Sequence, residues 1–209
     1  SDKPKRESAH SFAWHRQVLL EFIERLDLRN VVLVVQDWGE LLGLTLPMVA
    51  PGRYRGLLAM NTLLATGDPL PTGFLAWRDW CRRNPGYDIA RLLQRGCPAM
   101  AADEAAAYAA PFPDTGHRAA LRAFPERVPA QPEAPGAEIS RAAQRFWAVE
   151  WSGATLVAAG LRDPVLGLPV MQPLADGIRQ AAPPLQLAEA GHFVPEWGES
   201  LARHALGVF

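Results

Sequence analysis

The fold is decided by residues 31–61, which read VVLVVQDWGELLGLTLPMVAPGRYRGLLAMN. Val31 to Val35 is a short aliphatic and mostly β-branched run, typical of a strand covered on both faces in a parallel sheet. The apolar stretch from Leu41 to Ala50 predicts a buried helix that ends before Pro51-Gly52. A second apolar run, from Gly56 to Met60, predicts another strand. This order indicates a βαβ unit with parallel strands and a right-handed crossover.

Patterns on either side of this unit extend the α/β core. Residues 10–28 carry apolar side chains near a 3.6-residue period and predict an amphipathic helix, with Ser8 or Ser11 as its N-cap. Further along the chain, the same criteria predict helices at 139–150, 174–181 and 195–208, and strands at 155–159 and 185–188. We therefore expect an α/β fold whose sheet is mostly parallel and flanked by helices.

A helical insertion divides this core. Short helical patterns separated by Pro or Gly, with no convincing strand, follow the Gly/Pro-rich turn that begins at Thr66. A Pro-rich linker from Ala130 to Gly136 then leads back to the α/β pattern. The expected parts are a first core segment at 1–67, a helical cap at 68–131 and a second core segment at 132–209.

Composition limits the classes of function. The 21 Lys and Arg residues against 22 Asp and Glu residues leave a net charge of -1, which disfavours nucleic-acid and membrane-surface partners. No apolar run approaches the roughly 18 residues of a membrane-spanning helix. Cys81 and Cys97 form neither a metal cluster nor a disulfide framework, which fits an intracellular chain or one that is indifferent to redox conditions. We expect no metal, and of the compartments a cytoplasmic location.

The segment Val35 to Gly39 has the spacing of a nucleophile elbow, a sharp turn between strand and helix that lifts one side chain above the sheet edge. Asp37 stands at the nucleophile position of this turn. The alternative interpretation is that Asp37 only caps the helix that follows, because Asp is a preferred N-cap residue. The pentapeptide alone does not favour one interpretation over the other.

Two further residues follow predicted strands in the same way. Asp163 comes after the strand at 155–159, and His192 after the strand at 185–188. Taken singly, a histidine is more often a surface or satisfied core residue, and Asp163 could be a turn residue before Pro164. However, the order nucleophile, acid and histidine along the chain is that of the α/β-hydrolase triad, and all three positions open onto one sheet edge.

An Asp nucleophile implies a particular chemistry. An ionised carboxylate can attack an alkyl carbon without a base, but it leaves an ester that water must then hydrolyse. His192, oriented by Asp163, would activate that water. The leaving group would be a halide or the oxygen of a strained ring, and indole N–H groups are suited to receive the departing anion in a dry pocket.

The segments VVQDWGELLGLTLP, GLRDPVLG, AEAGHFVPEWGE, PFPDTGH and MNTLL together resemble the haloalkane dehalogenases of the α/β-hydrolase fold. The resemblance implies that Asp37 is the nucleophile, His192 the base and Asp163 the acid that orients it. It also implies that Trp38 and Trp77 bind the halide, without any cofactor. An acid after the strand at 155–159, with Asn61 where another branch has its acid, matches the two-tryptophan branch. The other tryptophans are expected to pack: Trp14, Trp80, Trp147, Trp151 and Trp197.

The resemblance further implies an apolar pocket for a short haloalkane substrate. Its lining would consist of Phe74, Phe124, Pro125, Val128, Leu166 and Phe193. For each residue taken singly, ordinary packing of cap against core is an equally good interpretation. A monomer with a role in detoxification is expected.

The sequence departs from the family pattern at two places. Glu40 stands where a second glycine is usual, and it is either a solvated first-turn residue or a residue that crowds the turn. The chain begins with SDKP, a motif that lies well inside full-length relatives, so we expect N-terminal strands and a His-Gly loop to be missing. An epoxide hydrolase and an inactive hydrolase-like fragment stay open as alternatives.

Overall fold

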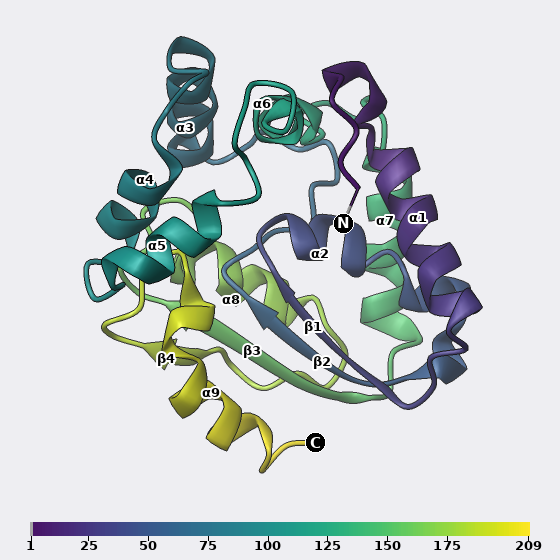
Figure 1. Ribbon diagram of the computed structural model, residues 1–209. Coiled ribbons are helices and arrows are strands. Elements are labelled where there is room, and N and C mark those ends of the chain that lie inside the picture. The colour runs from purple at the N-terminus through teal and green to yellow at the C-terminus, as the bar shows by residue number, and fades with distance from the viewer. Residues whose placement is uncertain (1) are drawn as a thin grey trace.

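The computed structural model describes residues 2–209, without the side chain of Glu40. Its sheet has four strands in the order β1-β2-β3-β4, and every neighbouring pair is parallel. The strands are β1 (Val31–Gln36), β2 (Tyr54–Met60), β3 (Ala154–Gly160) and β4 (Leu185–Leu187). The predicted α/β fold with a parallel sheet flanked by helices is therefore confirmed (Figure 1).

Helices cover both faces of the sheet because side chains alternate along its strands. Leu57 and Ala59 join an apolar cluster with the larger set of helices, α1 (Phe12–Arg25), α7 (Ala137–Val149) and α8 (Leu168–Asp176). Leu58 and Met60 point to the other face, where α9 (Gly198–Ala205) follows the short 3₁₀ helix η4 (Val194–Trp197). No helix within residues 2–209 has the length and apolarity to cross a bilayer.

The cap consists of four helices inserted between β2 and α7: α3 (Thr72–Arg83), α4 (Ile89–Gly96), α5 (Ala102–Ala109) and α6 (Ala119–Arg127). Figure 1 shows this teal group above the edge of the sheet at which the strands end. Arg82 of α3 joins α6 by donating through two guanidinium nitrogens to the Glu126 carboxylate, at 2.6 and 2.7 Å. The limits of the cap at residues 68 and 131 stay predictions.

Several helices have other limits than the sequence predicts. The helix expected at 10–28 is the shorter α1, and the one expected at 195–208 is η4 followed by α9. The helix expected at 41–50 is α2 (Trp38–Gly43), and a 3₁₀ helix (Pro47–Val49) follows it. Pro47 has no N–H to continue the helical hydrogen bonding, so the α-helix stops before it. The helix expected at 174–181 is α8, which begins at Leu168 because a proline is favourable in the first helical turn.

β1 is the edge strand of the described sheet, because it pairs only with β2 within residues 2–209. Val34, on the same face as α9, has 57% of its surface exposed. Gly43 packs on the opposite face of this strand, where an added Cβ would lie 2.7 Å from a methyl carbon of Val35. The described helices therefore cover β1 well on one face only.

A buried hydrogen bond joins α7 to the segment after α2. The Trp147 indole Nε1 donates to the Leu44 carbonyl at 2.8 Å, and the Trp147 side chain is almost fully buried. The substitution Trp147→Phe would leave this carbonyl unpaired in an apolar environment. We expect the free energy of unfolding, measured by urea denaturation, to fall by about 1 to 3 kcal/mol.

The matched control for this prediction is Trp14→Phe, because 41% of the Trp14 surface is exposed. That variant should stay within about 0.5 kcal/mol of the wild type. Equal losses in the two variants would contradict a specific role for the buried indole.

Candidate active site

Asp37 occupies a strained turn between β1 and α2. Its φ of 51° lies in the left-handed region, which a residue other than glycine seldom adopts. The end of β2 holds the turn in place, because Asp37 N donates to the Asn61 carbonyl at 3.3 Å and Thr62 Oγ1 donates to the Asp37 carbonyl at 3.0 Å. The predicted elbow geometry is confirmed, and its carboxylate is 42% exposed at the sheet edge.

His192 lies between Asp37 and Asp163. Its Nδ1 is 2.9 Å from Asp163 Oδ2, and its Nε2 is 3.8 Å from Asp37 Oδ1. The three residues follow β1, β3 and β4, so the parallel register brings them to one edge of the sheet. The structure thus brings together the three residues that the sequence predicts as a triad.

The Asp163 carboxylate is completely buried, and three donors compensate for its burial. Burial by itself raises its pKa, but the hydrogen bond and charge of His192 lower it. The Val165 amide at 2.8 Å and the Asn61 side-chain amide at 2.8 Å add to this effect. The pKa of Asp163 therefore lies below its usual value, and the residue stays ionised to orient His192.

His192 experiences opposing effects. Burial by itself lowers its pKa, whereas the hydrogen bond to Asp163 and the nearby Asp37 carboxylate raise it. The two carboxylates prevail, so the pKa of His192 lies above the ordinary histidine value. With Nδ1–H directed at Asp163, Nε2 is the atom that can exchange a proton with a bound water.

Asn61 is a component of this site for which the sequence predicts no contact with the triad. The side chain is fully buried, its Nδ2 donates to Asp163 Oδ2, and its Oδ1 accepts from Gly160 N at 2.7 Å. It therefore ties the end of β2 to the end of β3 and to the buried carboxylate. Its position directly after a predicted strand is the signal that could have found it.

Gln36 is a second residue that the sequence analysis left out. Its Nε2 lies 3.1 Å from the His192 carbonyl and 3.3 Å from His192 Nε2. The available signal is a polar residue at the end of an otherwise apolar strand, immediately before Asp37.

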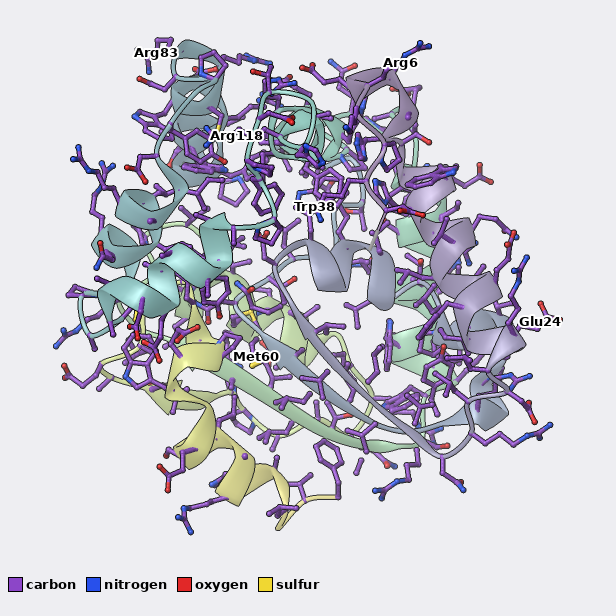
Figure 2. All side chains as sticks on the ribbon, viewed as in Figure 1. Arg6, Glu24, Trp38, Met60, Arg83 and Arg118 are labelled. Carbon is purple, nitrogen blue, oxygen red and sulfur yellow. The ribbon has the colours of Figure 1, made fainter. Side chains whose placement is uncertain are left out.

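Trp38 and Trp77 belong to one apolar cluster where cap and core meet, together with Phe74 and Val128. Trp38, labelled in Figure 2, starts α2. Its ring stacks on Phe124 of α6, with centroids 4.4 Å apart. Neither indole N–H donates to any protein group among the described residues. By contrast, the buried Trp147 and Trp151 indoles donate to Leu44 O and Thr155 Oγ1. The N–H groups of Trp38 and Trp77 are therefore available to a ligand.

The remaining predicted pocket residues divide into those near this cluster and those outside it. Pro125 is buried in α6 directly after Phe124. Phe193 lies edge-on to His192, with centroids 5.1 Å apart, but packs with the apolar side chains of α4. Leu166 is buried after β3 and is not part of the Trp38 cluster.

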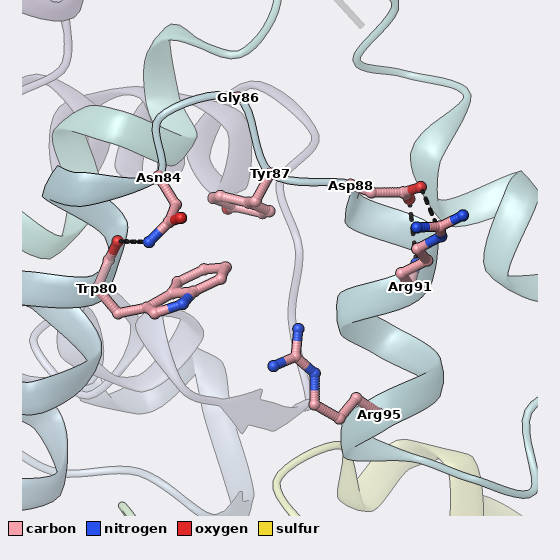
Figure 3. Close-up of a pocket in the computed structure, with 7 residues that line it drawn as sticks. All are labelled: Trp80, Asn84, Gly86, Tyr87, Asp88, Arg91 and Arg95. Carbon is pink, nitrogen blue, oxygen red and sulfur yellow. Dashed lines mark hydrogen bonds and ion pairs between the residues drawn. The ribbon is translucent and has the colours of Figure 1, made fainter.

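A hollow of about 320 Å³ lies on the cap between the end of α3 and α4. Trp80, Tyr87 and Arg95 are among its lining residues, and Figure 3 shows the Trp80 ring facing Tyr87. Trp80 also stacks on Trp77, with centroids 5.3 Å apart and planes at 18°. Trp80 therefore packs, as the sequence predicts, and its packing supports Trp77 from within the cap.

The chain is similar to known proteins over nearly its whole length. No protein-family model matches it. A haloalkane dehalogenase of Mycolicibacterium paratuberculosis is 36% identical, with 99% of this chain and 69% of the relative covered. A haloalkane dehalogenase from Psychrobacter cryohalolentis is 33% identical, with 97% of this chain and 68% of the relative covered. The solved structure of the tetrameric haloalkane dehalogenase DpaA from Paraglaciecola agarilytica superposes on this chain with a TM-score of 0.97. The two sequences are 38% identical, and the match covers 100% of this chain and 70% of DpaA.

The Asp163–His192 pair makes stability depend on pH. Folding raises the pKa of His192, so this contribution is complete below the unfolded value of 6.5 and is lost as the pH rises through the raised value. Folding lowers the pKa of Asp163, so its contribution is complete above 3.8 and is lost as the pH falls through the lowered value. The stabilisation relative to Asp163→Asn should therefore be largest between about pH 4 and 6.5 and decrease toward pH 9.

Urea denaturation across this pH range measures the effect. Asp176→Asn on the exposed side of α8 serves as the control, because Asp176 bonds only to Gln172 among the described residues. If wild type and Asp163→Asn differ by the same amount at pH 5.5 and pH 9, the buried ion pair does not set the pH dependence.

Proposed function

Because the chain belongs to the haloalkane dehalogenases, hydrolases that act on carbon–halide bonds, we propose that it hydrolyses short haloalkanes to an alcohol, a halide ion and a proton. The observation that carries this proposal is the line of Asp37, His192 and Asp163 at one sheet edge. A carboxylate on a strained turn faces the free nitrogen of an oriented imidazole. This arrangement suits displacement at carbon followed by hydrolysis of an ester.

In the first step, a carboxylate oxygen of Asp37 attacks the carbon that bears the halogen. The new carbon–oxygen bond makes an alkyl ester, and the carbon–halogen bond breaks with its electron pair leaving on the halide. No proton is transferred, because the aspartate attacks as an anion. The exposure of the Asp37 carboxylate at the elbow gives the substrate access to it.

The indole N–H groups of Trp38 and Trp77 stabilise the departing halide. Hydrogen-bond donors directed at a developing anion, in a site from which water is largely excluded, lower the barrier to its departure. The alkyl group lies against apolar side chains of cap and core. For this lining we propose Phe74, Phe124, Pro125, Val128, Leu166 and Phe193.

In the second step, His192 Nε2 takes a proton from water. The hydroxyl oxygen bonds to the ester carbonyl carbon, and Asp163 stabilises the imidazolium that forms. Cleavage of the bond from this carbon to the alkyl oxygen restores the Asp37 carboxylate. The alcohol leaves with one proton of the water, and His192 releases the other to solvent.

Epoxide hydrolysis also uses an aspartate nucleophile, but it requires an acid for the ring oxygen. Two of the three tyrosines that could supply one are engaged elsewhere, since Tyr54 belongs to the core cluster beneath the sheet and Tyr108 donates to Glu196. The Tyr87 ring packs on the cap against Trp77 and Trp80, with centroids 6.2 and 5.3 Å apart. The free indole donors therefore favour dehalogenation.

We also propose that one chain acts as a monomer, because it carries all three triad residues itself. The neighbour DpaA is described as tetrameric, so size-exclusion chromatography with light scattering is the relevant measurement. The cytoplasmic location and the role in detoxification stay predictions. The chain spans 69% of a curated relative's length, which makes activity of these 209 residues the first quantity to measure.

Bromide release from 1,2-dibromoethane tests the proposal. Asp37→Asn should reduce release at least about 1,000-fold, because the nucleophile is lost. His192→Phe should also stop turnover, but only after the first step. Mass spectrometry of that variant should therefore show the alkyl ester on the peptide that contains Asp37.

Two outcomes would contradict the mechanism. Bromide release by Asp37→Asn at the wild-type rate would exclude Asp37 as nucleophile. Failure of the folded wild type to release bromide and of His192→Phe to form the ester would show that this chain does not dehalogenate.

The role of Trp77 predicts a defect in the halide-dependent step. Trp77→Phe keeps an aromatic ring but removes the N–H, and we expect a decrease in kcat of about 100-fold together with weaker product inhibition by bromide. Trp14→Phe on the exposed face of α1 is the matched control and should leave both quantities unchanged. Unaltered bromide inhibition in Trp77→Phe would show that this indole does not bind the halide.

A further inference from the structure

Gln36 contacts the same histidine twice. Gln36 is the last residue of β1 and directly precedes the nucleophile. It is 156 positions away from His192 in the sequence. Its side-chain nitrogen lies 3.1 Å from the His192 main-chain carbonyl and 3.3 Å from the ring nitrogen Nε2. An amide nitrogen has two hydrogens, so a single group can serve both contacts.

The carbonyl contact determines which way the amide faces. A flipped amide would direct its oxygen at the His192 carbonyl oxygen, and two acceptors cannot form a hydrogen bond. The nitrogen therefore faces His192. Its second hydrogen can bond to the ring only when Nε2 carries a lone pair.

This requirement agrees with the other side of the ring. Nδ1–H donates to the buried Asp163 carboxylate at 2.9 Å, which leaves Nε2 unprotonated in the neutral imidazole. Asp163 and Gln36 thus favour the same tautomer from opposite sides. That tautomer has its lone pair on the atom that must accept a proton from water.

We propose that Gln36 is a positioning residue, which holds His192 by its main chain and ring and favours the neutral tautomer that acts as the base. The inference rests on the proposed function, since it assigns Gln36 a part in the second step of that reaction. At 3.3 Å the contact to the ring is long for a hydrogen bond, so a water molecule can displace it and approach Nε2.

The charge of Asp37 changes during the proposed reaction, and this change decides when the contact between Gln36 and the ring favours the neutral imidazole. Two carboxylates lie within ion-pair distance of His192 among the described residues, Asp163 at Nδ1 and Asp37 at Nε2. While Asp37 is ionised, it favours the imidazolium, against the effect of Gln36. When Asp37 becomes an ester, its charge is lost, and Gln36 is the described polar side chain that remains at Nε2. The base is thereby neutral when the ester must be hydrolysed.

The test compares the titration of His192 in the wild type and in Gln36→Met, by NMR of the imidazole Cε1–H across pH. Methionine keeps the length of the side chain but has no N–H to donate. We expect the midpoint for His192 to rise by about 0.5 to 1 pH unit, because a bond to the neutral form is lost. Gln36→Glu, which adds an acceptor and a negative charge, should raise it further.

The chain offers a matched control. Gln172→Met on α8 also removes a side-chain amide that bonds to another side chain, at Asp176. In Gln172→Met, the titration midpoint of His192 should equal that of the wild type. The His192→Phe spectrum identifies the His192 signal among the five histidines. If Gln36→Met fails to fold, Gln36→Asn retains an amide too short to reach the ring and carries the same expectation.

An unchanged His192 midpoint in a folded Gln36 variant would overturn the proposal, as would an equal rise in Gln172→Met. A rise of the His192 midpoint in the Gln36 variants alone would support the proposal. The acid limb of the pH profile for ester hydrolysis should then shift by the same number of pH units. The titration does not require turnover. A wild type without bromide release would therefore refute the proposed function, while the His192 midpoint still decides the role of Gln36.

Discussion

The buried carboxylate of Asp163 is the constraint on which the site depends. A fully buried charge is tolerated only when ionic and hydrogen-bonding partners replace the water that it loses. Here the partners are the His192 ring, the Val165 amide and the Asn61 side chain, which come from segments after three different strands. The strands must therefore be in register before the charge is stabilised. The ion pair that orients His192 therefore forms only when the sheet is correctly assembled.

The strained turn at Asp37 and the hydrogen bonds that stabilise it lie at the same edge of the sheet as the buried carboxylate. Asp37 adopts a φ of 51°, and the hydrogen bonds from and to the Asn61–Thr62 segment hold it there. The segment after β2 thus supports the nucleophile through its backbone and the acid through the Asn61 side chain. This explains why a residue without a chemical role in the reaction is completely buried at the centre of the site.

The surroundings of His192 differ on its two sides. Asp163 at Nδ1 is buried and keeps its charge throughout the proposed reaction, whereas Asp37 at Nε2 is partly exposed and exchanges its charge for an ester. The cap contributes in another way, through aromatic stacking of Phe124 on Trp38 and of Trp80 on Trp77. Stacking leaves the indole N–H groups available, so the Trp38–Phe124 contact between core and cap and the Trp77–Trp80 contact within α3 each leave a donor for an anion.

The sequence by itself determined the α/β order and the three residues of the triad. Asp37, Asp163 and His192 each follow a predicted strand, and because the ends of parallel strands meet at one edge, this order predicted that the three side chains lie together. Local pattern did not determine where α2 ends, because Pro47 lies inside an apolar stretch that otherwise reads as helix. Nor did it show that Gln36 and Asn61 reach His192 and Asp163. Those contacts join residues more than a hundred positions apart, and only the register of the assembled strands brings their side chains within hydrogen-bonding distance.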